Sequence, residues 1–275
     1  NSSFTSTTGY IGAIAGYPDE AVISGCTVTN TTVTGATAGG IVGYVVDYCE
    51  VENCVTSEIT VSSNSSTGYA GGIAGENIDT KSAGAYGIVE LCGNRGKVVT
   101  DKDIAGGICG INQSVIRNCW NIGAITAGTD NAGGIAGLQK KADESVNVDP
   151  LVENCWSTGK VTCDGGKTAG GLIGKGMGSL TVRNCYTTMD VAIGEKDTSG
   201  GTPNISKVET KTRDQFTSGE VAYLLQKDLT TPIWGQNLDN GKPVQTVPLF
   251  STATVYQIKL DDKGAVGYSN DPNAD

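Results

Sequence analysis

The chain of 275 residues contains no histidine, only 3 phenylalanines and 2 methionines, and its aromatic residues amount to 6%. Without histidine it cannot form the Ser-His-Asp or Cys-His arrangements of nucleophilic enzymes. So few large apolar residues would leave a conventional globular core underfilled. These absences favour a fold whose interior is built from thin rows of small and β-branched side chains, as in repeat proteins.

Positive charge and long apolar runs are also scarce. The 19 lysines and arginines against 29 aspartates and glutamates give a net charge of −10, which argues against a nucleic-acid surface. No apolar run approaches the roughly 20 residues of a membrane span. There is no CxxC pair for zinc, no GK[ST] directly after the glycine-rich AGGIAG segments to make them phosphate loops, and no GGxGxDx calcium repeat. The sequence therefore predicts no metal, no cofactor, no catalytic residue and no nucleic-acid or membrane partner.

Glycine is abundant, at 40 residues, and it is arranged with cysteine in a motif that recurs six times. The most compact copy, residues 104–126, reads IAGGICGINQSVIRNCWNIGAIT. The Gly-Gly-Ile part ends at Gly16, Gly43, Gly75, Gly110, Gly137 and Gly174, and the second part centres on Cys26, Cys54, Cys92, Cys119, Cys155 and Cys185. Repetition at this period is typical of a solenoid.

Short segments rich in Val, Ile and Thr lie between the glycines and favour strands over helices. We therefore expect an all-β fold, a right-handed parallel β-helix of about six coils, over residues 1–200. A small α+β capping segment, 201–250, and a terminal part, 251–275, with one or two strands or the start of another module and a disordered tail, should follow. The shared place in the motif predicts an inward column of Ile41, Ile73, Ile108, Ile135 and Leu172.

Six of the nine cysteines occupy the same repeat position. In stacked coils they would lie about 4.8 Å apart with parallel Cβ vectors, whereas a disulfide needs vectors that converge. We therefore expect a ladder of buried free thiols that act as small hydrophobic side chains. Cys49, Cys109 and Cys163 lie off this column, and the sequence leaves open whether any of them forms a disulfide.

The Gly-Gly-Ile-x-Gly motif followed by an Asn-Cys strand resembles the GLUG repeats of large bacterial surface and secreted proteins, including IgA-cleaving peptidases and adhesin-like proteins. The resemblance covers roughly Tyr10 to Val191. It implies a β-solenoid at the cell surface or outside the cell, and it implies no catalytic residues. Repeats one and three have Ser-Gly-Cys and Glu-Leu-Cys in place of Asn-Cys, so these two coils are expected to bend differently.

The segment after the repeats reads differently. Ser218 can cap a short helix from about 219 to 228, with an apolar face of Phe216, Val221, Leu224 and Leu225. This segment resembles the closing motif that often follows GLUG arrays, with SGE-x-AY-LL and then WGQ. Its expected role is to cover the open strand edges of the last coil.

Two columns flank the cysteines. The residue after the cysteine is aromatic in three repeats, as Trp120, Trp156 and Tyr186. These rings form either a ladder that shields the coil edges or a platform for a sugar ring. The residue two before the cysteine alternates in charge, as Arg117, Glu153 and Arg183, and is expected to pair charges between neighbouring coils.

The spacing between motifs places the long insertions at one corner, between the Gly-Gly-Ile part and the cysteine, over 77–90 and 138–153. With the short corner of repeat four between them, they would form a shallow binding cleft. The cleft would be floored by Asn112, Gln113 and Ser114 and walled by Tyr86, Lys140, Lys141 and Asp143. The alternative is that these are surface insertions without a ligand.

The function expected from the sequence is a non-enzymatic bacterial surface or secreted module that binds a glycan or a host protein. A rigid spacer that presents another domain, such as a peptidase, is the alternative, and an enzyme that acts on polysaccharide ranks third. The chain opens part-way into a repeat without a signal peptide, so we expect it to be a piece of a longer extracellular protein, and a monomer.

Overall fold

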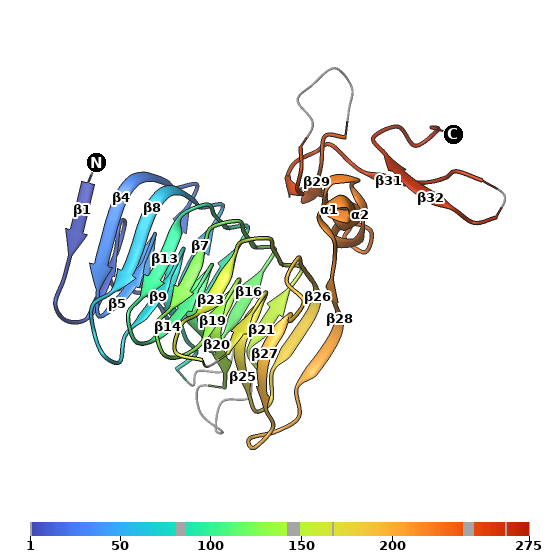
Figure 1. The fold of residues 1–275 in the computed structure, drawn as a ribbon. Coiled ribbons are helices and arrows are strands. Elements are labelled where there is room, and N and C mark those ends of the chain that lie inside the picture. Colours follow the sequence, from blue (N-terminus) through green and yellow to red (C-terminus); the bar gives the residue numbers. More distant parts are fainter. Residues whose placement is uncertain are drawn as a thin grey trace. The chain divides into compact units, whose positions relative to one another are not determined.

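The computed structural model of the protein describes residues 2–80, 86–141, 149–166, 168–238, 245–261 and 263–274. The chain forms two compact units, Asn1–Glu209 and Thr210–Asp275 (Figure 1). Strands dominate, and the sheets of the first unit are parallel, as the sequence predicts. Both helices, α1 (Arg213–Thr217) and α2 (Glu220–Gln226), belong to the second unit.

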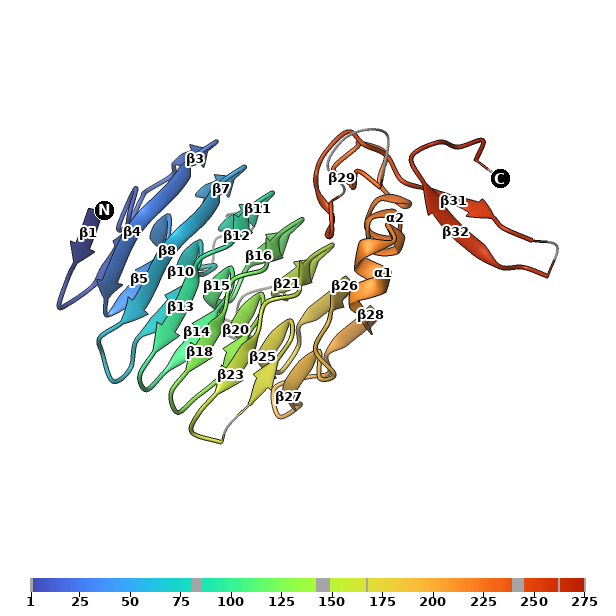
Figure 2. The same cartoon turned by 45° about the horizontal axis from the view of Figure 1, so that its top comes forward.

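Two six-stranded sheets hold the glycine-rich motifs. Each strand pairs with the equivalent strand of the next repeat, so that Gly71 lies beside Gly106 and Ala74 beside Cys109. The chain thus passes through both sheets once per repeat, and the repeats follow one another in sequence order (Figure 2). Sheet B contains β2 (Tyr10–Gly12), β5 (Thr37–Gly39), β9 (Tyr69–Gly71), β14 (Ile104–Gly106), β19 (Ala132–Gly133) and β24 (Ala169–Gly170). Sheet C contains β6 (Val42–Val45), β10 (Ala74–Asn77), β15 (Cys109–Asn112), β20 (Ala136–Lys140), β25 (Ile173–Met177) and β27 (Ile193–Asp197).

A sixteen-stranded sheet, sheet A, holds the cysteine part of each repeat. Before the cysteine lie β3 (Val22–Ser24), β7 (Glu50–Glu52), β11 (Ile88–Glu90), β16 (Val115–Arg117) and β21 (Leu151–Glu153). After it lie β12 (Gly93–Asn94), β13 (Lys97–Thr100), β17 (Trp120–Asn121), β18 (Ile125–Ala127), β22 (Trp156–Ser157) and β23 (Val161–Cys163). The sheet is completed by β1 (Ser2–Thr5), β28 (Asn204–Thr210) and the longer strands β4 (Thr27–Gly35), β8 (Val55–Ser63) and β26 (Thr181–Thr187).

The interior is built from columns of one residue per repeat. The five residues of the predicted Ile/Leu column are all fully buried: Ile41, Ile73, Ile108, Ile135 and Leu172. The next position along the chain forms a second buried column of Val42, Ala74, Cys109, Ala136 and Ile173, paired in register through sheet C. Side chains of this small size fill a narrow interior, and the core cluster that they form contains no aromatic residue among those described.

The turn between sheets B and C has no room for side chains. A Cβ built on Gly106 would lie 1.8 Å from the carbonyl oxygen of Cys109, and one on Gly110 would lie 2.6 Å from that of Gly75. Backbone atoms cannot move aside as a flexible side chain can, so only glycine fits. The two sheets therefore approach closely, and Ile104 from sheet B packs against Ile111 and Leu138 from sheet C.

The bend before the cysteine uses the left-handed backbone conformation. Asn118, directly before Cys119, takes it at φ 53°. Asparagine and glycine adopt this conformation at lower cost than other residues, which explains the Asn-Cys motif. The expectation that repeats one and three bend differently is wrong, because Gly25 and Leu91, at φ 68° and 50°, bend in the same way. The full set is Gly25, Asn53, Leu91, Asn118, Asn154 and Asn184.

All nine cysteines are free thiols, and five of the six in the predicted ladder are buried. Within each repeat the thiol donates to the carbonyl two residues earlier, at 3.2 Å from Cys119 to Arg117 and 3.1 Å from Cys155 to Glu153. Burial raises the pKa of the Cys119 and Cys185 thiols well above the ordinary value. Cys26 is the exception to the expected burial: it follows β3, which among the described strands pairs on one side only, with β7.

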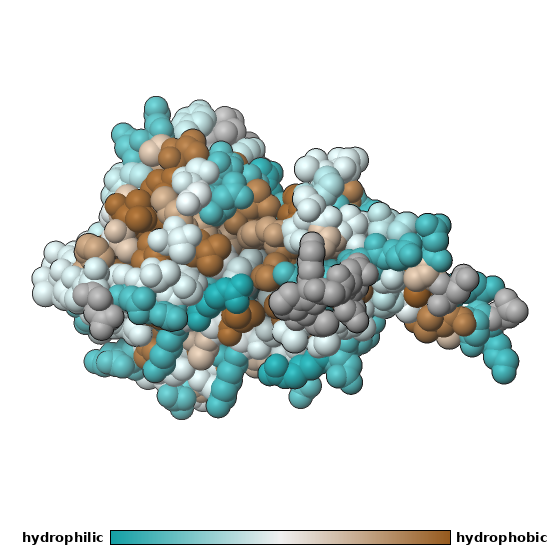
Figure 3. Space-filling view, turned by 90° about the horizontal axis from the view of Figure 1, so that it is seen from above, coloured by the Kyte–Doolittle hydropathy of each residue, from teal (hydrophilic) through white to brown (hydrophobic). Residues whose placement is uncertain are grey.

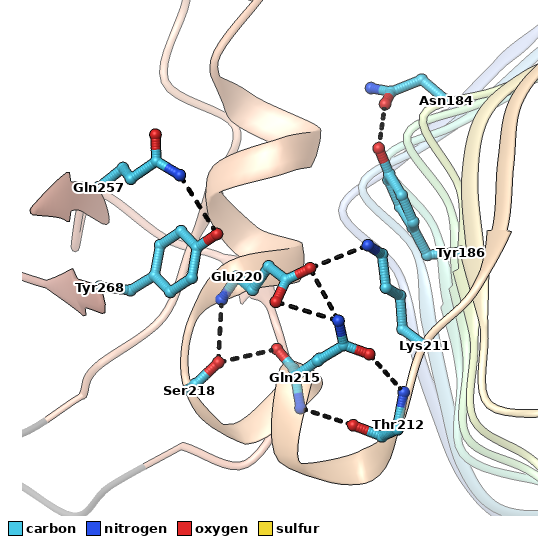
Figure 4. Close-up of polar contacts among 9 residues, drawn as sticks. All are labelled: Asn184, Tyr186, Lys211, Thr212, Gln215, Ser218, Glu220, Gln257 and Tyr268. Carbon is cyan, nitrogen blue, oxygen red and sulfur yellow. Dashed lines mark hydrogen bonds and ion pairs between the residues drawn. The ribbon is translucent and has the colours of Figure 1, made fainter. Parts of the chain in front are cut away.

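The second unit contains two short helices where the sequence predicts one. Thr212 begins α1 with a capping box, in which the Thr212 hydroxyl accepts from the Gln215 amide and the Gln215 side chain accepts from the Thr212 amide (Figure 4). Ser218 is not the cap of the predicted helix: it ends α1, and the left-handed Gly219 begins α2. The unit also contains the pairs β29 (Trp234–Gly235) with β30 (Leu249–Phe250) and β31 (Tyr256–Lys259) with β32 (Val266–Ser269).

The apolar side chains of these helices form the interior of the second unit. Phe216, Val221, Ala222 and Leu225 are buried, while Leu224 is only partly buried. The Glu220 carboxylate accepts hydrogen bonds from the side-chain amide of Gln215 and from the Lys211 ammonium, and the bond from Gln215 ties the two helices together (Figure 4). Neither helix in the described part of the chain is long and apolar enough to cross a membrane.

Candidate functional site

The aromatic column after the cysteines is buried and therefore does not form an exposed platform. Trp120, Trp156 and Tyr186 are all at most 2% exposed. The two tryptophan rings stack at 5.8 Å between centroids, and the Arg95 guanidinium lies 4.7 Å over the Trp120 ring. A Cβ on Gly93 would touch the Trp120 ring at 2.1 Å, so this glycine leaves the space that the ring fills. The expectation that these rings form a binding platform is wrong, because all three rings are buried.

The predicted cleft floor is also buried. Asn112, Gln113 and Ser114 are at most 4% exposed. Asn112 accepts a hydrogen bond from Asn77 and donates to the Leu151 carbonyl, so it ties three neighbouring repeats together. These residues stabilise the stack and do not present polar groups to a ligand, and their predicted role in binding is wrong.

The structure describes three of the four residues predicted to wall the cleft. Tyr86 is partly buried, and Asp143 lies outside the described residues. Lys140 and Lys141 line a shallow hollow of about 140 Å³ with Met177, Gly178, Ser199 and Gly200, which belong to the following repeat and the segment after it. Lys141 also lies 3.8 Å from the Asp149 carboxylate. The lysines therefore face the C-terminal end of the repeat unit.

The charged column before the cysteines pairs charges as the sequence predicts. Arg117 forms an ion pair with Glu90, and Arg183 forms one with Glu153 at 2.5 Å. Three carboxylates, those of Glu50, Glu52 and Glu90, lie within 4.8 Å of one another. Burial and the Glu90 charge raise the pKa of Glu50, while Arg117 lowers it. This cluster is partly neutralised by its own arginine, which is the arrangement expected of a register device.

The outward positions of sheet C differ from all these columns. They are the residues directly after the last glycine of each motif, and strand register aligns them as Tyr44, Glu76, Ile111, Leu138, Lys175 and Glu195. We call this set the outer row of sheet C. Tyr17 extends it into repeat one, because Ala15 bridges Val42 and the Tyr44 amide donates to the Gly16 carbonyl. In the middle of the row, Ile111 and Leu138 pack with Ile104 and are nearly buried.

Tyrosines gather where the N-terminal end of this row meets sheet B. The rings of Tyr17 and Tyr44 stack, with centroids 5.1 Å apart and planes 10° apart. Tyr10, from sheet B, lies 4.3 Å from the Tyr44 ring and 5.9 Å from the Tyr17 ring, tilted by 40° and 42°. Tyr44 is buried beneath them at 9% exposure, whereas Tyr10 and Tyr17 are 42% and 56% exposed. We call Tyr10, Tyr17 and Tyr44 the tyrosine cluster.

Glu76 stands next to the tyrosine cluster. It pairs directly with Tyr44 in the parallel ladder of β6 and β10. Burial raises the pKa of the Glu76 carboxyl, and Lys140 is the charge that lowers it. Burial and then the Glu76 charge raise the pKa values of the Tyr10, Tyr44 and Tyr69 phenols. These effects place the Glu76 carboxylate within electrostatic reach of three tyrosines.

Sequence reasoning missed this cluster, although a signal was present. The position directly after the motif glycine is tyrosine in two successive repeats, as Gly16-Tyr17 and Gly43-Tyr44. Tyr10 and Tyr69 share the matching position before the Gly-Gly turn, each starting its strand of sheet B. Comparing these two columns on either side of the turn would have predicted that the tyrosines lie close together.

The space-filling view shows hydrophobic residues gathered over the repeat unit, with hydrophilic residues between and around them (Figure 3).

These observations leave the tyrosine cluster with Glu76 as the best candidate site in the described residues. Exposed aromatic rings beside a carboxylate can stack on a flat ligand and accept hydrogen bonds from it. Comparison with known proteins finds no family model, no curated protein and no solved structure that matches this chain.

Proposed function

We propose that residues 1–209 form a right-handed parallel β-solenoid of the GLUG type and that the chain is a module of a bacterial surface or secreted protein. Two observations support this proposal. Each described strand of sheets B and C pairs in parallel with the equivalent strand of the adjacent repeat, and the Asn-Cys motif coincides with a left-handed bend in all four repeats that carry it. A surface location would be tested by probing intact and permeabilised bacteria with an antibody against the chain. Detection only after permeabilisation would overturn it.

The proposed function is non-enzymatic binding of a glycan or a host surface protein. The observation that carries it is the tyrosine cluster: two tyrosines that are 42% and 56% exposed are held by ring contacts on a rigid sheet corner. A side chain that is already ordered loses little conformational entropy when a ligand binds. Exposed aromatic residues held in this way are typical of binding surfaces.

The binding proposal is tested by screening the full chain against a glycan array and a panel of purified extracellular host proteins. Tyr17→Ala should remove binding to whatever ligand is found. Tyr48→Ala is the matched control, since Tyr48 is 57% exposed and lies outside the cluster. If the chain binds nothing on either panel, or if Tyr17→Ala binds as well as the wild type, the proposed function is wrong.

A rigid spacer is the second candidate, because polar ladders inside the stack tie repeats together. Asn94 donates to Asn121 at 2.8 Å and Asn121 donates to the Ser157 hydroxyl at 3.2 Å, which links repeats three, four and five. Such buried hydrogen bonds resist bending of the stack. A spacer without a ligand predicts that the tyrosine variants behave as the wild type in every binding assay.

A further inference from the structure

The rings of the tyrosine cluster decide which shape of ligand can bind there. Their centroids lie 4.3–5.9 Å apart, so the rings touch one another and leave no ring-sized gap between them. A cation cage needs aromatic faces arranged around an empty centre, each within about 6 Å of the cation. The cluster therefore offers the outer surfaces of Tyr10 and Tyr17 as a platform, on which a flat body with an apolar face can lie.

Glu76 supplies the polar part of the site. In the part of the chain that the structure describes, no ion pair within 4.0 Å and no hydrogen bond to its carboxylate is found, and Lys140 is the charge that lowers its pKa. Burial raises its pKa, so the surroundings are less polar than water. A carboxylate oxygen in such a position gains from accepting hydrogen bonds that hydroxyl groups donate, because hydrogen bonds to a carboxylate are shorter and stronger than those between neutral groups.

Charge narrows the choice of ligand further. The chain carries a net charge of −10, and Glu76 adds a local negative charge beside the platform. An anionic ligand such as a sulfated or uronic-acid glycan would be repelled by both. A neutral ligand with hydroxyl groups along its edge and C–H groups on its face fits the platform and the carboxylate together.

Resting on the ligand-binding function proposed above, we propose that Tyr10, Tyr17 and Glu76 form a subsite for a neutral pyranose sugar of a glycan. The sugar stacks its C–H face on the exposed tyrosine rings, and its hydroxyl groups donate hydrogen bonds to the Glu76 carboxylate. Tyr44, nearly buried beneath the other two rings, positions Tyr17 and does not contact the sugar face.

The test is calorimetric titration of the full chain with neutral pyranose oligosaccharides, namely cello-, xylo-, manno- and malto-hexaose, and with a uronic-acid hexamer. At least one neutral hexaose should bind, and the uronic-acid hexamer should bind at least tenfold more weakly. Tyr17→Ala should weaken the binding at least tenfold, whereas Tyr17→Phe, which keeps the ring, should bind within about twofold of the wild type. Glu76→Gln should weaken it about tenfold, which reflects the loss of the charged acceptor.

Three results would overturn this proposal. They are failure of every neutral hexaose to bind, equal binding by wild type and Tyr17→Ala, and tighter binding of the acidic hexamer. If the chain binds no sugar but binds a host protein in a Tyr17-dependent manner, the sugar subsite is wrong while the proposed binding function stands. Tyr48→Ala, with the same exposure outside the cluster, controls for general effects of removing a tyrosine.

Discussion

Two adjacent columns of sheet C differ in how much the residue type varies from one repeat to the next. The glycine column, formed by Gly43, Gly75, Gly110, Gly137 and Gly174, has the same residue in every repeat. The outer row of sheet C begins one residue later and changes from tyrosine to glutamate, isoleucine, leucine, lysine and glutamate. A Cβ added to any glycine of the first column would lie 2.5–2.7 Å from the closest backbone atom, whereas the residues of the second column face outward.

This difference separates the residues that hold the fold from those that are free to bind. Where backbone packs on backbone, only one residue type fits and the repeats look alike. Where side chains point away from the interior, each repeat can carry a different residue without disturbing the stack. We therefore expect changes in the interior and in the glycine turns to act on stability, and changes in the outer row to act mainly on binding.

The largest expected effect comes from a charge placed in the interior. Ile135 is fully buried in a column of apolar side chains. Ile135→Asp buries a carboxylate without a partner, which costs about 3–5 kcal/mol, and we expect the repeat unit to unfold cooperatively. Circular dichroism and thermal melting measure this effect. A variant that melts with the wild type would contradict the interior position of this column.

The next largest effect tests the glycine turn. Gly106→Ala places a Cβ 1.8 Å from the Cys109 carbonyl oxygen, and the backbone shift needed to relieve this contact should cost about 3 kcal/mol. Gly176→Ala is the control, because its closest neighbour is a flexible Leu180 methyl group at 2.9 Å. Chemical denaturation of both variants should show a large loss for the first and a small one for the second. Equal losses of stability in the two variants would contradict the close backbone contact at Gly106.

A gain in stability is expected at the bend before the cysteine. Leu91 holds a left-handed conformation at φ 50°, which costs an ordinary residue about 1–2 kcal/mol. Leu91→Asn restores the residue found at this bend in the neighbouring repeats and should stabilise the chain by about 1 kcal/mol. Leu91→Ala, which has no polar side chain to hydrogen-bond the local backbone, is the control. Denaturation curves in which the asparagine variant is no more stable than the alanine variant would contradict this explanation of the motif.

The smallest effect concerns the outer row and depends on pH. Burial raises the pKa of Glu76 above its ordinary value of 4.5, so its ionisation costs more in the folded chain than in the unfolded chain. The stability that Glu76 contributes is present below pH 4.5 and is lost as the pH rises through the folded-state pKa. Glu76→Gln should therefore melt slightly higher than the wild type at pH 7 and equally at pH 4. A variant that melts lower at pH 7 would show that the carboxylate has a stabilising partner.

The sequence predicts the repeating frame well, because equivalent positions of the motif meet the same packing environment in every repeat. Ile135 and Cys119 are buried by virtue of their column, and the bend at Asn118 follows from its residue type. The exposure of single outward residues does not follow from the motif. Trp120 looks exposed in the sequence but is covered by Trp156 and Arg95, a packing that arises only when the repeats are stacked.

The candidate site also could not be predicted from the motif alone. Tyr10 and Tyr44 belong to different repeats and different sheets, and only the turn geometry brings their rings to 4.3 Å. The sequence analysis places the binding cleft at the insertions because the length of that corner varies between repeats. The cluster lies instead at a corner without insertions, where the variation is in residue type at a fixed position.

The central claim is that the exposed tyrosines bind while the frame beneath them holds the fold. The most direct measurement compares Tyr17→Ala with the wild type in melting temperature and in affinity for the same neutral oligosaccharide. Since Tyr17 is 56% exposed and its ring contacts are worth about 0.5–1.5 kcal/mol, we expect a fall of only a few degrees together with at least tenfold weaker binding. Unchanged affinity, or unfolding of the variant, would contradict the separation of frame and site.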